Sequence, residues 1–381
     1  MAFLRNRAVN WIYLHSGIRN LAQGMGGVFV LVFLLRAGVS VPASLCAMAL
    51  VFAARFAIRP AVLGPAKRFG LKPLVVAGSL VMALQYPLLA AVHGIDAALL
   101  AYCLVTALGD TFYWTSYHAY FAMLGDNEHR GHQTSANFAL SAVVGIAAPL
   151  CGAWALVVVG AQAAFGAVGL VQALAAVPLL ATPNVEVPRT APGSLRSALP
   201  GVGLFMADGW LDVSYVLVWQ IALFFSLGQS LSAYGGAMAL AALVGAVSGL
   251  LLGRHIDAGH GRRAVAIAFS ALSLTLLLRA LSVGAPWLAV GANAIGALAS
   301  CLLAPTQMVP VYNLAKVSPC ALRFHIASEG GWDVGCASGC LIAAFLIARG
   351  APLGGVLLVA FVGVAGQVLL LRRSYVRIGA W

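Results

Sequence analysis

Residues 97–123 read AALLAYCLVTALGDTFYWTSYHAYFAM, a mostly apolar stretch whose only acidic residue is Asp110. A helix needs about 20 consecutive apolar residues to cross the hydrocarbon core of a bilayer, which is roughly 30 Å thick. Inside that core a helix satisfies its backbone polar groups within the segment itself. The stretch therefore predicts a membrane-spanning helix, and it determines how the rest of the chain is interpreted.

The same pattern repeats along almost the whole chain. Hydrophobic residues make up 62% of the 381 residues and charged residues only 8%, which is far from the composition of soluble domains. The sequence thus predicts an all-α membrane protein. We expect roughly twelve spans separated by short polar loops, over residues 9–35, 40–62, 72–93, 97–123, 134–159, 161–182, 201–227, 231–253, 263–282, 286–315, 323–348 and 352–372.

The positive charge of the chain is concentrated in the short loops on one side. The net charge of +12 therefore indicates membrane topology and not nucleic-acid binding. With a cytoplasmic N-terminus, the outer side receives only Arg36, Arg279 and Arg349, and the inner side receives Arg5, Arg7, Lys67, Arg68, Lys72, Arg130, Arg189, Arg196, Arg254, Arg262, Arg263, Lys316, Arg323, Arg372, Arg373 and Arg377. We expect a multi-pass protein of a cytoplasmic (inner) membrane with both termini in the cytoplasm.

One polar break is longer than the others and divides the chain in two. Residues 183–200 contain four prolines and several charges, a composition typical of a loop. We predict an N-terminal six-helix bundle in residues 1–182, a cytoplasmic linker in residues 183–200 and a C-terminal six-helix bundle in residues 201–381. The halves share a weak repeat, as duplicated transporter units do, in which Arg130-Gly131-His132 and Ser135 correspond to Arg323-Phe324-His325 and Ser328.

Three local motifs add to this pattern. The loop between the eighth and ninth spans reads GRHIDAGHGRR over residues 253–263 and contains Gly253, Asp257, Gly261, Arg262 and Arg263. The loop between the second and third spans reads GPAKRFGLK over residues 64–72 and contains Gly64, Arg68 and Gly70. The fifth span contains GIAAPLCG over residues 145–152.

With these motifs the chain resembles the major facilitator superfamily of secondary transporters over nearly its whole length. It departs from the family pattern in residues 64–72, where Lys67 or Arg68 stands in place of an aspartate. The resemblance implies twelve helices in two pseudo-symmetric six-helix bundles. It also implies a central cavity lined by helices 1, 4, 7 and 10 and contacts between the bundles through helices 2, 5, 8 and 11. Residues 145–152 are similar to the Gly-Pro motif of antiporters in this family.

The charges inside the spans can be sorted on that plan. A charge at the bilayer centre costs about 2.5–3.5 kcal/mol on insertion scales, so such residues are expected to be paired, hydrated or functional. Residues four apart share a helix face. The predicted cavity residues are His15, Arg19 and Gln23 in the first span, Asp110, Tyr113, Trp114, Tyr117 and His118 in the fourth, and Asp208 and Asp212 in the seventh.

Two interpretations of this cavity remain open. In one, Arg19 neutralises a single acid and the aromatic rings only pack. In the other, Asp110, Asp208 or Asp212 exchanges a proton while Arg19 competes for the same carboxylate, so that binding is coupled to protonation. Because acids outnumber bases in this set, the sequence favours a cationic or zwitterionic substrate.

A second group of charges lies on the second and eleventh spans. Arg55 and Arg59 are one turn apart on a descending helix, and Glu329 and Asp333 are one turn apart on a rising helix. At about 1.5 Å per residue, Arg59 and Glu329 have similar depth, and Arg55 and Asp333 each lie about 6 Å deeper. We predict a gate between the bundles near the cytoplasm. The alternatives are a static network within each half, or snorkelling of Arg59 to the headgroups.

Other function classes have less support. No nucleotide-binding loop, zinc-protease histidine pair or nucleophile elbow occurs in a usable context, so we do not expect an enzyme. No tight His, Cys and carboxylate cluster occurs, so we expect neither a metal site nor a cofactor.

We therefore predict a monomeric, proton-coupled transporter of a small organic solute that works by alternating access, with export by antiport preferred on the strength of residues 145–152. Its expected partners are the solute, protons and the lipid bilayer, and not nucleic acid. The alternatives are proton-coupled uptake of a solute or metal chelate, and a sensor or scaffold that does not transport.

Overall fold

The structure is all-helical over the residues that it describes. This computed structural model describes residues 6–124, 130–256 and 261–377, without the side chains of residues 122, 130–143, 249–256, 261–264, 304–305, 308–310, 312–313, 316 and 373–377. Within those ranges the regular elements are helices, and no strand is present. Eleven helical segments there are long and apolar enough to span a membrane, and Val144–Val158 is a shorter apolar segment. Together they agree with the prediction of twelve spans.

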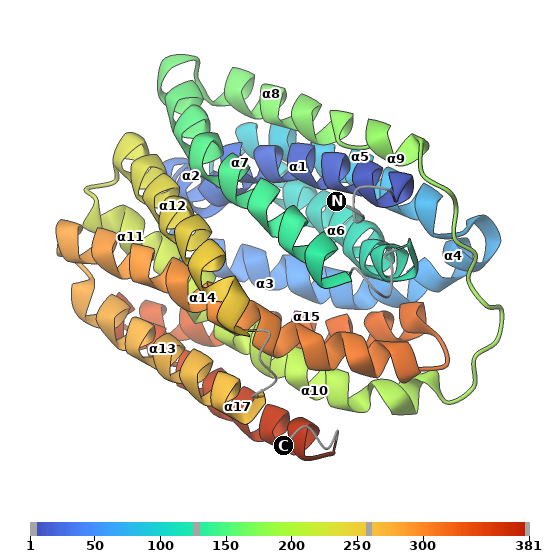
Figure 1. Ribbon diagram of the computed structural model, residues 1–381. Coiled ribbons are helices and arrows are strands. Elements are labelled where there is room, and N and C mark those ends of the chain that lie inside the picture. Colours follow the sequence, from blue (N-terminus) through green and yellow to red (C-terminus); the bar gives the residue numbers. More distant parts are fainter. Residues whose placement is uncertain (1–5, 125–129, 257–260, 378–381) are drawn as a thin grey trace.

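The first half contains six spans, three of them divided into shorter helical pieces (Figure 1). Its elements are α1 (Arg7–Met25), η2 (Gly27–Phe29) and α2 (Val30–Arg36); α3 (Val41–Ile58), η3 (Arg59–Val62) and α4 (Leu63–Phe69); α5 (Leu71–Ala90); α6 (Ala97–Leu124); α7 (Arg130–Val158); and α8 (Ala161–Leu174) with α9 (Val177–Leu180). Gly26 separates α1 from η2, and Pro60 lies in η3. Glycine weakens a helix and proline removes one of its hydrogen bonds, so both residues favour a division at these points.

The second half also contains six spans. Its elements are α10 (Ser194–Asp212), η4 (Val213–Val218) and α11 (Trp219–Ser226); α12 (Leu231–Ile256); α13 (Gly261–Ser282); α14 (Pro286–Val317); α15 (Ala321–Ala348); and α16 (Leu353–Leu357) with α17 (Ala360–Arg377). The η4 segment is a π-helix, a wider turn that is rare in proteins and is found mostly at functional sites.

The connection between α9 and α10 is shorter than the predicted linker. α10 begins at Ser194 and not at residue 201, so Pro200 lies inside a helix. A proline in the second turn costs the helix a single backbone hydrogen bond, which the long span tolerates. Gly193 precedes the helix with φ of 79°, a left-handed conformation that glycine adopts without strain.

The connection is also tied to both halves. The Asn184 side chain accepts a hydrogen bond from the Lys72 backbone N–H at 3.1 Å, at the start of α5. Arg323 in the first turn of α15 donates to the Arg189 carbonyl oxygen at 2.8 Å. We call the membrane side that carries this connection the linker side.

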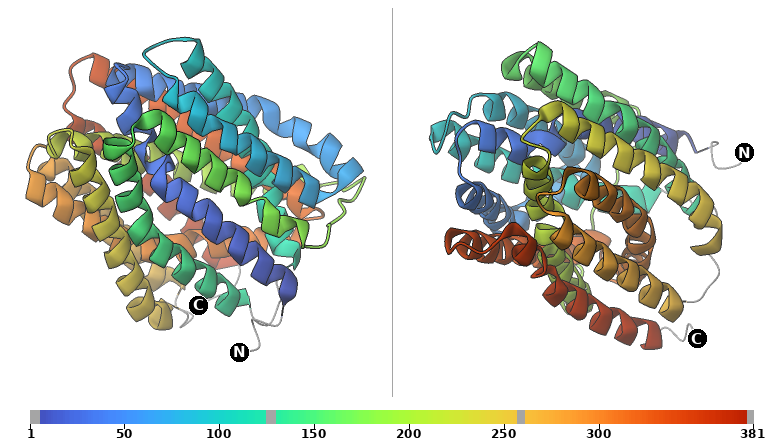
Figure 2. Two further views of the ribbon diagram at one scale, coloured as in Figure 1. Left: turned by 90° about the horizontal axis from the view of Figure 1, so that it is seen from above. Right: turned by 90° about the vertical axis from the view of Figure 1, so that its left-hand side faces the viewer.

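Helix contacts follow one plan in both halves. In the first half α1 packs against α7 and α8, α5 against α6 and α8, and α3 against α6. In the second half α10 packs against α15 and α17, α13 against α14 and α17, and α12 against α14. Each first-half contact has a counterpart between the equivalent spans of the second half, as a duplicated unit requires. The two bundles lie side by side in the molecule (Figures 1 and 2).

The two bundles meet along two pairs of helices, α3 with α15 and α7 with α12. These are the second, eleventh, fifth and eighth spans, as the family resemblance implied. Small residues allow the backbones to approach closely. A Cβ atom added to Gly235 of α12 would lie 2.6 Å from the Cβ of Ala153 in α7. A larger residue at this position would push the bundles apart.

Candidate functional site

Two arginines of the second span lie at the centre of the contact between the bundles. Arg55 in α3 is 5% exposed, and Arg59 at the start of η3 is 1% exposed. Ten residues separate Arg59 from Phe69 at the linker-side end of the span, which corresponds to a depth of about 15 Å. A buried guanidinium at this depth requires partners that carry negative charge.

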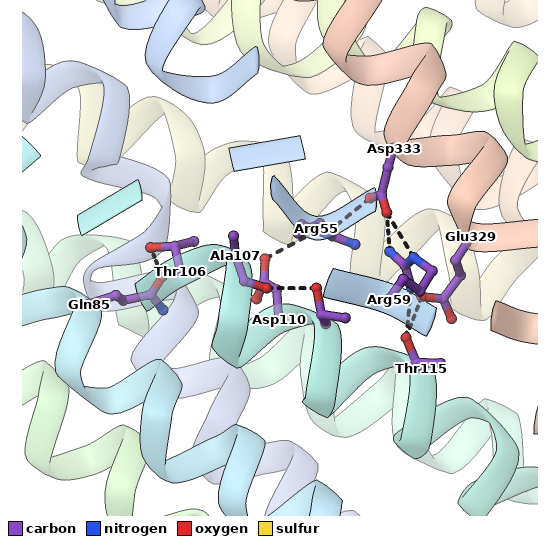
Figure 3. A network of polar contacts seen from close by, with 10 residues as sticks. Arg55, Arg59, Gln85, Thr106, Ala107, Asp110, Thr115, Glu329 and Asp333 are labelled. Atoms are coloured by element: carbon purple, nitrogen blue, oxygen red, sulfur yellow. Dashed lines mark hydrogen bonds and ion pairs between the residues drawn. The ribbon is translucent and has the colours of Figure 1, made fainter. Parts of the chain in front are cut away.

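Arg59 connects α3 to both neighbouring helices (Figure 3). Its Nε donates to Asp333 Oδ2 at 2.8 Å, its Nη2 pairs with the same oxygen, and its Nη1 pairs with Glu329 Oε2. Its Nη1 also donates to Thr115 Oγ1 of α6 at 2.7 Å. Arg59 therefore binds two carboxylates that belong to the other bundle.

Arg55 extends the network in the same direction. Its Nε lies 3.0 Å from Asp333 Oδ1, and its Nη1 lies 3.2 Å from Asp110 Oδ2 of α6. Its guanidinium also lies over the Trp332 ring, 5.0 Å from the centroid. Asp333, which is fully buried, thus receives both arginines.

The four residues proposed as a gate are brought together, with two contacts that the sequence did not predict. Arg59 pairs with Glu329, and Arg55 lies 3.0 Å from Asp333. The additional contacts are Arg59 with Asp333 and Arg55 with Asp110. Asp110, assigned to the cavity from the sequence, is therefore held by Arg55 and not by Arg19.

Arg19 has a different environment from the two arginines of the second span. Its guanidinium lies over the Trp114 ring at 4.5 Å and over the Tyr113 ring at 5.5 Å, and its Nη2 donates to Asn20 Oδ1 at 2.8 Å. Among the side chains that the structure describes, no carboxylate lies within ion-pair distance of Arg19. The competition of Arg19 for a carboxylate therefore stays a prediction, and the structure shows no ion pair for it among the described side chains.

His15 of α1 and Tyr113 of α6, two further predicted cavity residues, are bound to each other within the first bundle. His15 is fully buried; its Nδ1 lies 2.6 Å from the Ala175 carbonyl oxygen and its Nε2 lies 2.7 Å from the Tyr113 hydroxyl. Because a carbonyl oxygen only accepts, Nδ1 carries the proton and the Tyr113 hydroxyl donates to Nε2. Tyr117 is fixed in the same way by Ser16, at 2.8 Å between the two hydroxyl oxygens. These contacts hold α1 and α6 together within the first bundle.

His118 reaches the other bundle through a stack of rings. Its imidazole stacks on Trp114 with 5.5 Å between centroids, and on His325 of α15 with 5.6 Å. Gln23, the remaining predicted cavity residue of α1, is exposed.

The two acids of α10 lie apart from the arginines. Asp208 accepts hydrogen bonds from Gln307 of α14 at 2.9 Å and from Gln367 of α17 at 2.8 Å. A cavity of about 10 Å³ adjoins these three side chains, which is about the space of one water molecule. Asp212, one turn further along, lies within hydrogen-bonding reach of the Trp332 side chain. Asp208 therefore faces the interior of the second bundle, and it does not lie opposite Asp110 as a shared cavity would require.

The loop motifs are described only in part. Gly64 and Arg68 lie in α4, with Arg68 over the Phe69 ring at 5.1 Å. Gly70 ends that helix with φ of 81°, a conformation that favours glycine. In the other motif Gly253 lies in α12, and Gly261, Arg262 and Arg263 begin α13 without described side chains; Asp257 lies outside the described residues.

Sequence reasoning missed several polar residues of the site. Thr115, Trp332, Gln307 and Gln367 are neutral, so no charge drew attention to them. Arg279 was placed among the outer charges, but only 4% of it is exposed. It donates to the Tyr215 carbonyl oxygen at 2.6 Å and lies over the Tyr215 and Trp219 rings at 4.2 and 4.8 Å. It is therefore a component of the second bundle, beside the π-helix.

Comparison with known proteins identifies the fold. No protein-family profile matches the sequence, and no curated protein does. The human organic anion transporter MFSD10 (TETRAN) is similar in structure, with a TM-score of 0.70, 16% identity, and coverage of 96% of this chain and 99% of that chain. The POT family transporter PepTSo is also similar, with a TM-score of 0.65, 12% identity, and coverage of 97% and 98%. This chain has the major facilitator fold. At these identities the likeness extends to the arrangement of helices and not to individual site residues.

Proposed function

We propose that this protein is a secondary active transporter, and not an enzyme, that moves a small organic solute by alternating access coupled to protons. The observation that carries the proposal is the buried ion network that crosses from one bundle to the other. The two structural neighbours described above are transporters. The positive-inside pattern of the loops assigns the linker side to the cytoplasmic side of an inner membrane. We further propose that the protein acts as a monomer.

The network supports alternating access because its contacts belong to different bundles. Arg59 is in the first bundle, and Glu329 and Asp333 are in the second. For the linker side to open, α15 must move away from α3, and these contacts must break or exchange partners. Asp110 lies on the first bundle with Arg55, so it remains as a partner for that arginine when Asp333 withdraws. The network is thus suited to two states.

The acids of α10 support coupling to protons. Among the described side chains, Asp208 and Asp212 have no cationic partner. Two carboxylates one turn apart repel each other when both are charged, and the binding of one proton to the pair removes this repulsion. Asp208 and Asp212 are therefore the groups that exchange the coupled proton, as a pair rather than as single sites. The acids bound to arginine serve the gate.

Export by antiport is the direction that we favour. The motif of residues 145–152 lies in α7, which packs against α12 across the bundle contact. A Cβ atom added at Gly145 would lie 3.4 Å from the Ala242 Cβ in α12, so small residues let this contact slide.

The test uses purified protein in liposomes that contain a pH-sensitive dye. A gradient of anionic, neutral or cationic organic solutes is imposed in turn, and the proton movement is recorded with and without the protein. Antiport predicts protons moving against the solute, and symport predicts protons moving with it. An absence of proton movement with every solute, together with an absence of solute flux, would reject transport and leave a sensor or scaffold role. Asp208→Asn serves as the coupling-deficient comparison.

A further inference from the structure

Arg19 is an intramembrane cation of the first bundle that takes no part in the ion network. Arg55 and Arg59 are bound to Asp110, Glu329 and Asp333. Arg19 is instead partly exposed, with one hydrogen bond to Asn20 and two ring contacts. A charged side chain held inside a membrane span without a counter-ion is expected to have a functional partner.

The position of Arg19 excludes lipid headgroups as that partner. Arg19 lies twelve residues from Arg7 at the linker-side end of α1, and this separation corresponds to about 18 Å along the helix. The guanidinium points at rings of α6, inside the bundle, and not along the helix toward the membrane surface. A solute is therefore the partner that this position leaves for Arg19.

Planar groups beside Arg19 indicate the shape of this solute. The guanidinium covers Trp114, Trp114 stacks on His118, and His118 stacks on His325 of the other bundle. Trp114 is also held in place by edge contacts with Tyr113 at 5.1 Å and Tyr117 at 6.0 Å. A rigid series of flat groups offers a stacking surface at low entropic cost.

We infer that Arg19, Trp114 and His118 recognise a planar organic anion, and this inference rests on the proposed transport function. The carboxylate of the solute pairs with the Arg19 guanidinium, and its ring packs against the edge of the stack, because the ring faces already contact Arg19, each other and His325. Because His325 belongs to the second bundle, a ring at this edge lies beside both bundles, which places the solute where alternating access acts on it. The sequence had favoured a cationic substrate because acids outnumber bases. The structure weakens this preference, because Arg55 binds Asp110 and the hydrogen-bonding partners of Asp208 lie within the second bundle.

The test compares four small probes on the purified protein in phosphatidylcholine nanodiscs. Benzoate is planar and anionic, benzamide is planar and neutral, benzylammonium is planar and cationic, and cyclohexanecarboxylate is anionic but not planar. We expect benzoate to bind at least about tenfold more tightly than each of the others, by calorimetry or by the rise in apparent melting temperature. Equal or tighter binding of benzylammonium would overturn the inference without any variant.

Variants assign the binding to named groups. Arg19→Gln is expected to weaken benzoate binding by at least about tenfold, and Arg19→Lys by less, because lysine keeps the charge but loses the planar fork. Arg36→Gln, which removes an exposed arginine of the same span, is the matched control and leaves binding unchanged. Trp114→Leu is expected to weaken benzoate and not cyclohexanecarboxylate. Unchanged benzoate affinity in Arg19→Gln would refute the assignment.

Three further results test this inference separately from the transport proposal. If phosphatidylglycerol nanodiscs abolish benzoate binding, a lipid headgroup occupies Arg19 and the inference fails. If liposomes show coupled flux of a cationic solute while benzoate does not bind, transport stands and the substrate class is wrong. If benzoate binds through Arg19 but no solute crosses the membrane, the binding site stands and the transport proposal fails.

Discussion

Replacing Arg59 by glutamine should open the linker side of the protein. The substitution keeps a side chain that can donate a hydrogen bond but removes the charge that joins Glu329 and Asp333 to α3. Removing one partner of a buried ion pair costs about 3–5 kcal/mol. Asp333 retains Arg55 at 3.0 Å, so the lower end of that range, about 3 kcal/mol, applies to the closed state.

This magnitude predicts a large change in the populations of the two states. About 3 kcal/mol corresponds to a factor of about 150 in an equilibrium constant. A protein that rests at about 99:1 in favour of the closed state would therefore move to about 40:60. The variant remains folded because loss of the ion pairs destabilises the closed state and not the open state.

Cys320 reports this change. It precedes α15 on the linker side, is 6% exposed, and belongs to an apolar cluster that includes Val62 and Ala66 of the first bundle. The remaining cysteines, Cys46, Cys103, Cys151, Cys301, Cys336 and Cys340, are replaced by alanine. A membrane-impermeant maleimide is applied from the linker side. When opening and closing are fast, the labelling rate follows the open fraction, so Arg59→Gln should label about 50-fold faster than its parent.

The control for this experiment is Arg68→Gln, which removes an exposed arginine of the same span outside the network. It should leave the labelling rate unchanged. An unchanged rate in Arg59→Gln, in protein that elutes as folded material, would show that the network does not hold the linker side closed. An equal increase in Arg68→Gln would point to a general loss of positive charge instead.

Three further predictions follow from individual contacts. Asp208→Asn and its counterpart Asp212→Asn should abolish solute-driven proton movement in liposomes while solute binding persists, and a normal proton signal in both would remove these acids from the coupling step. A Cβ atom at Gly78 would lie 2.5 Å from the Tyr113 backbone nitrogen, so Gly78→Ala should destabilise the protein by about 1–3 kcal/mol in thermal unfolding. An unchanged melting temperature would contradict the tight packing of α5 on α6. Asp96 caps α6 outside the membrane, and hydrogen bonds from backbone N–H groups lower its pKa below the usual 3.8. The cap therefore stabilises the protein fully above pH 3.8, and this stabilisation is lost as the pH falls through the lowered pKa. The difference in melting temperature between the parent and Asp96→Ala should shrink in that acidic range, and a difference that grows there would contradict this sign.

The spans could be predicted from the sequence because the bilayer imposes a condition on each segment separately. A stretch such as residues 97–123 is long and apolar whatever its neighbours are, and α6 occupies Ala97–Leu124. The residue at which a helix begins is less well determined by the sequence than the existence of the span. Pro200 reads as a loop residue, but it lies inside α10 because one lost hydrogen bond is small beside the packing of the whole helix.

The site could be predicted only as far as single helices allow. Charges inside apolar spans are conspicuous, and a four-residue spacing gives a common face. The pairs Arg59 with Glu329 and Arg55 with Asp333 could therefore be predicted. The rotation of one helix against another is not contained in that spacing. For this reason the partner of Asp110 was not predicted.

The long separation in sequence between Arg59 and its acids has a consequence for biosynthesis. Hydrogen bonds join Arg59 to residues 270 and 274 positions further along the chain. At about 5–20 residues per second, a ribosome needs about 15–50 s to supply them. During that interval the Arg59 guanidinium has Thr115 of α6 as a hydrogen-bond partner but lacks Glu329 and Asp333. Nascent chains should therefore require protection by the insertion machinery until the last third is made, and truncated products that end before α15 should be degraded rapidly.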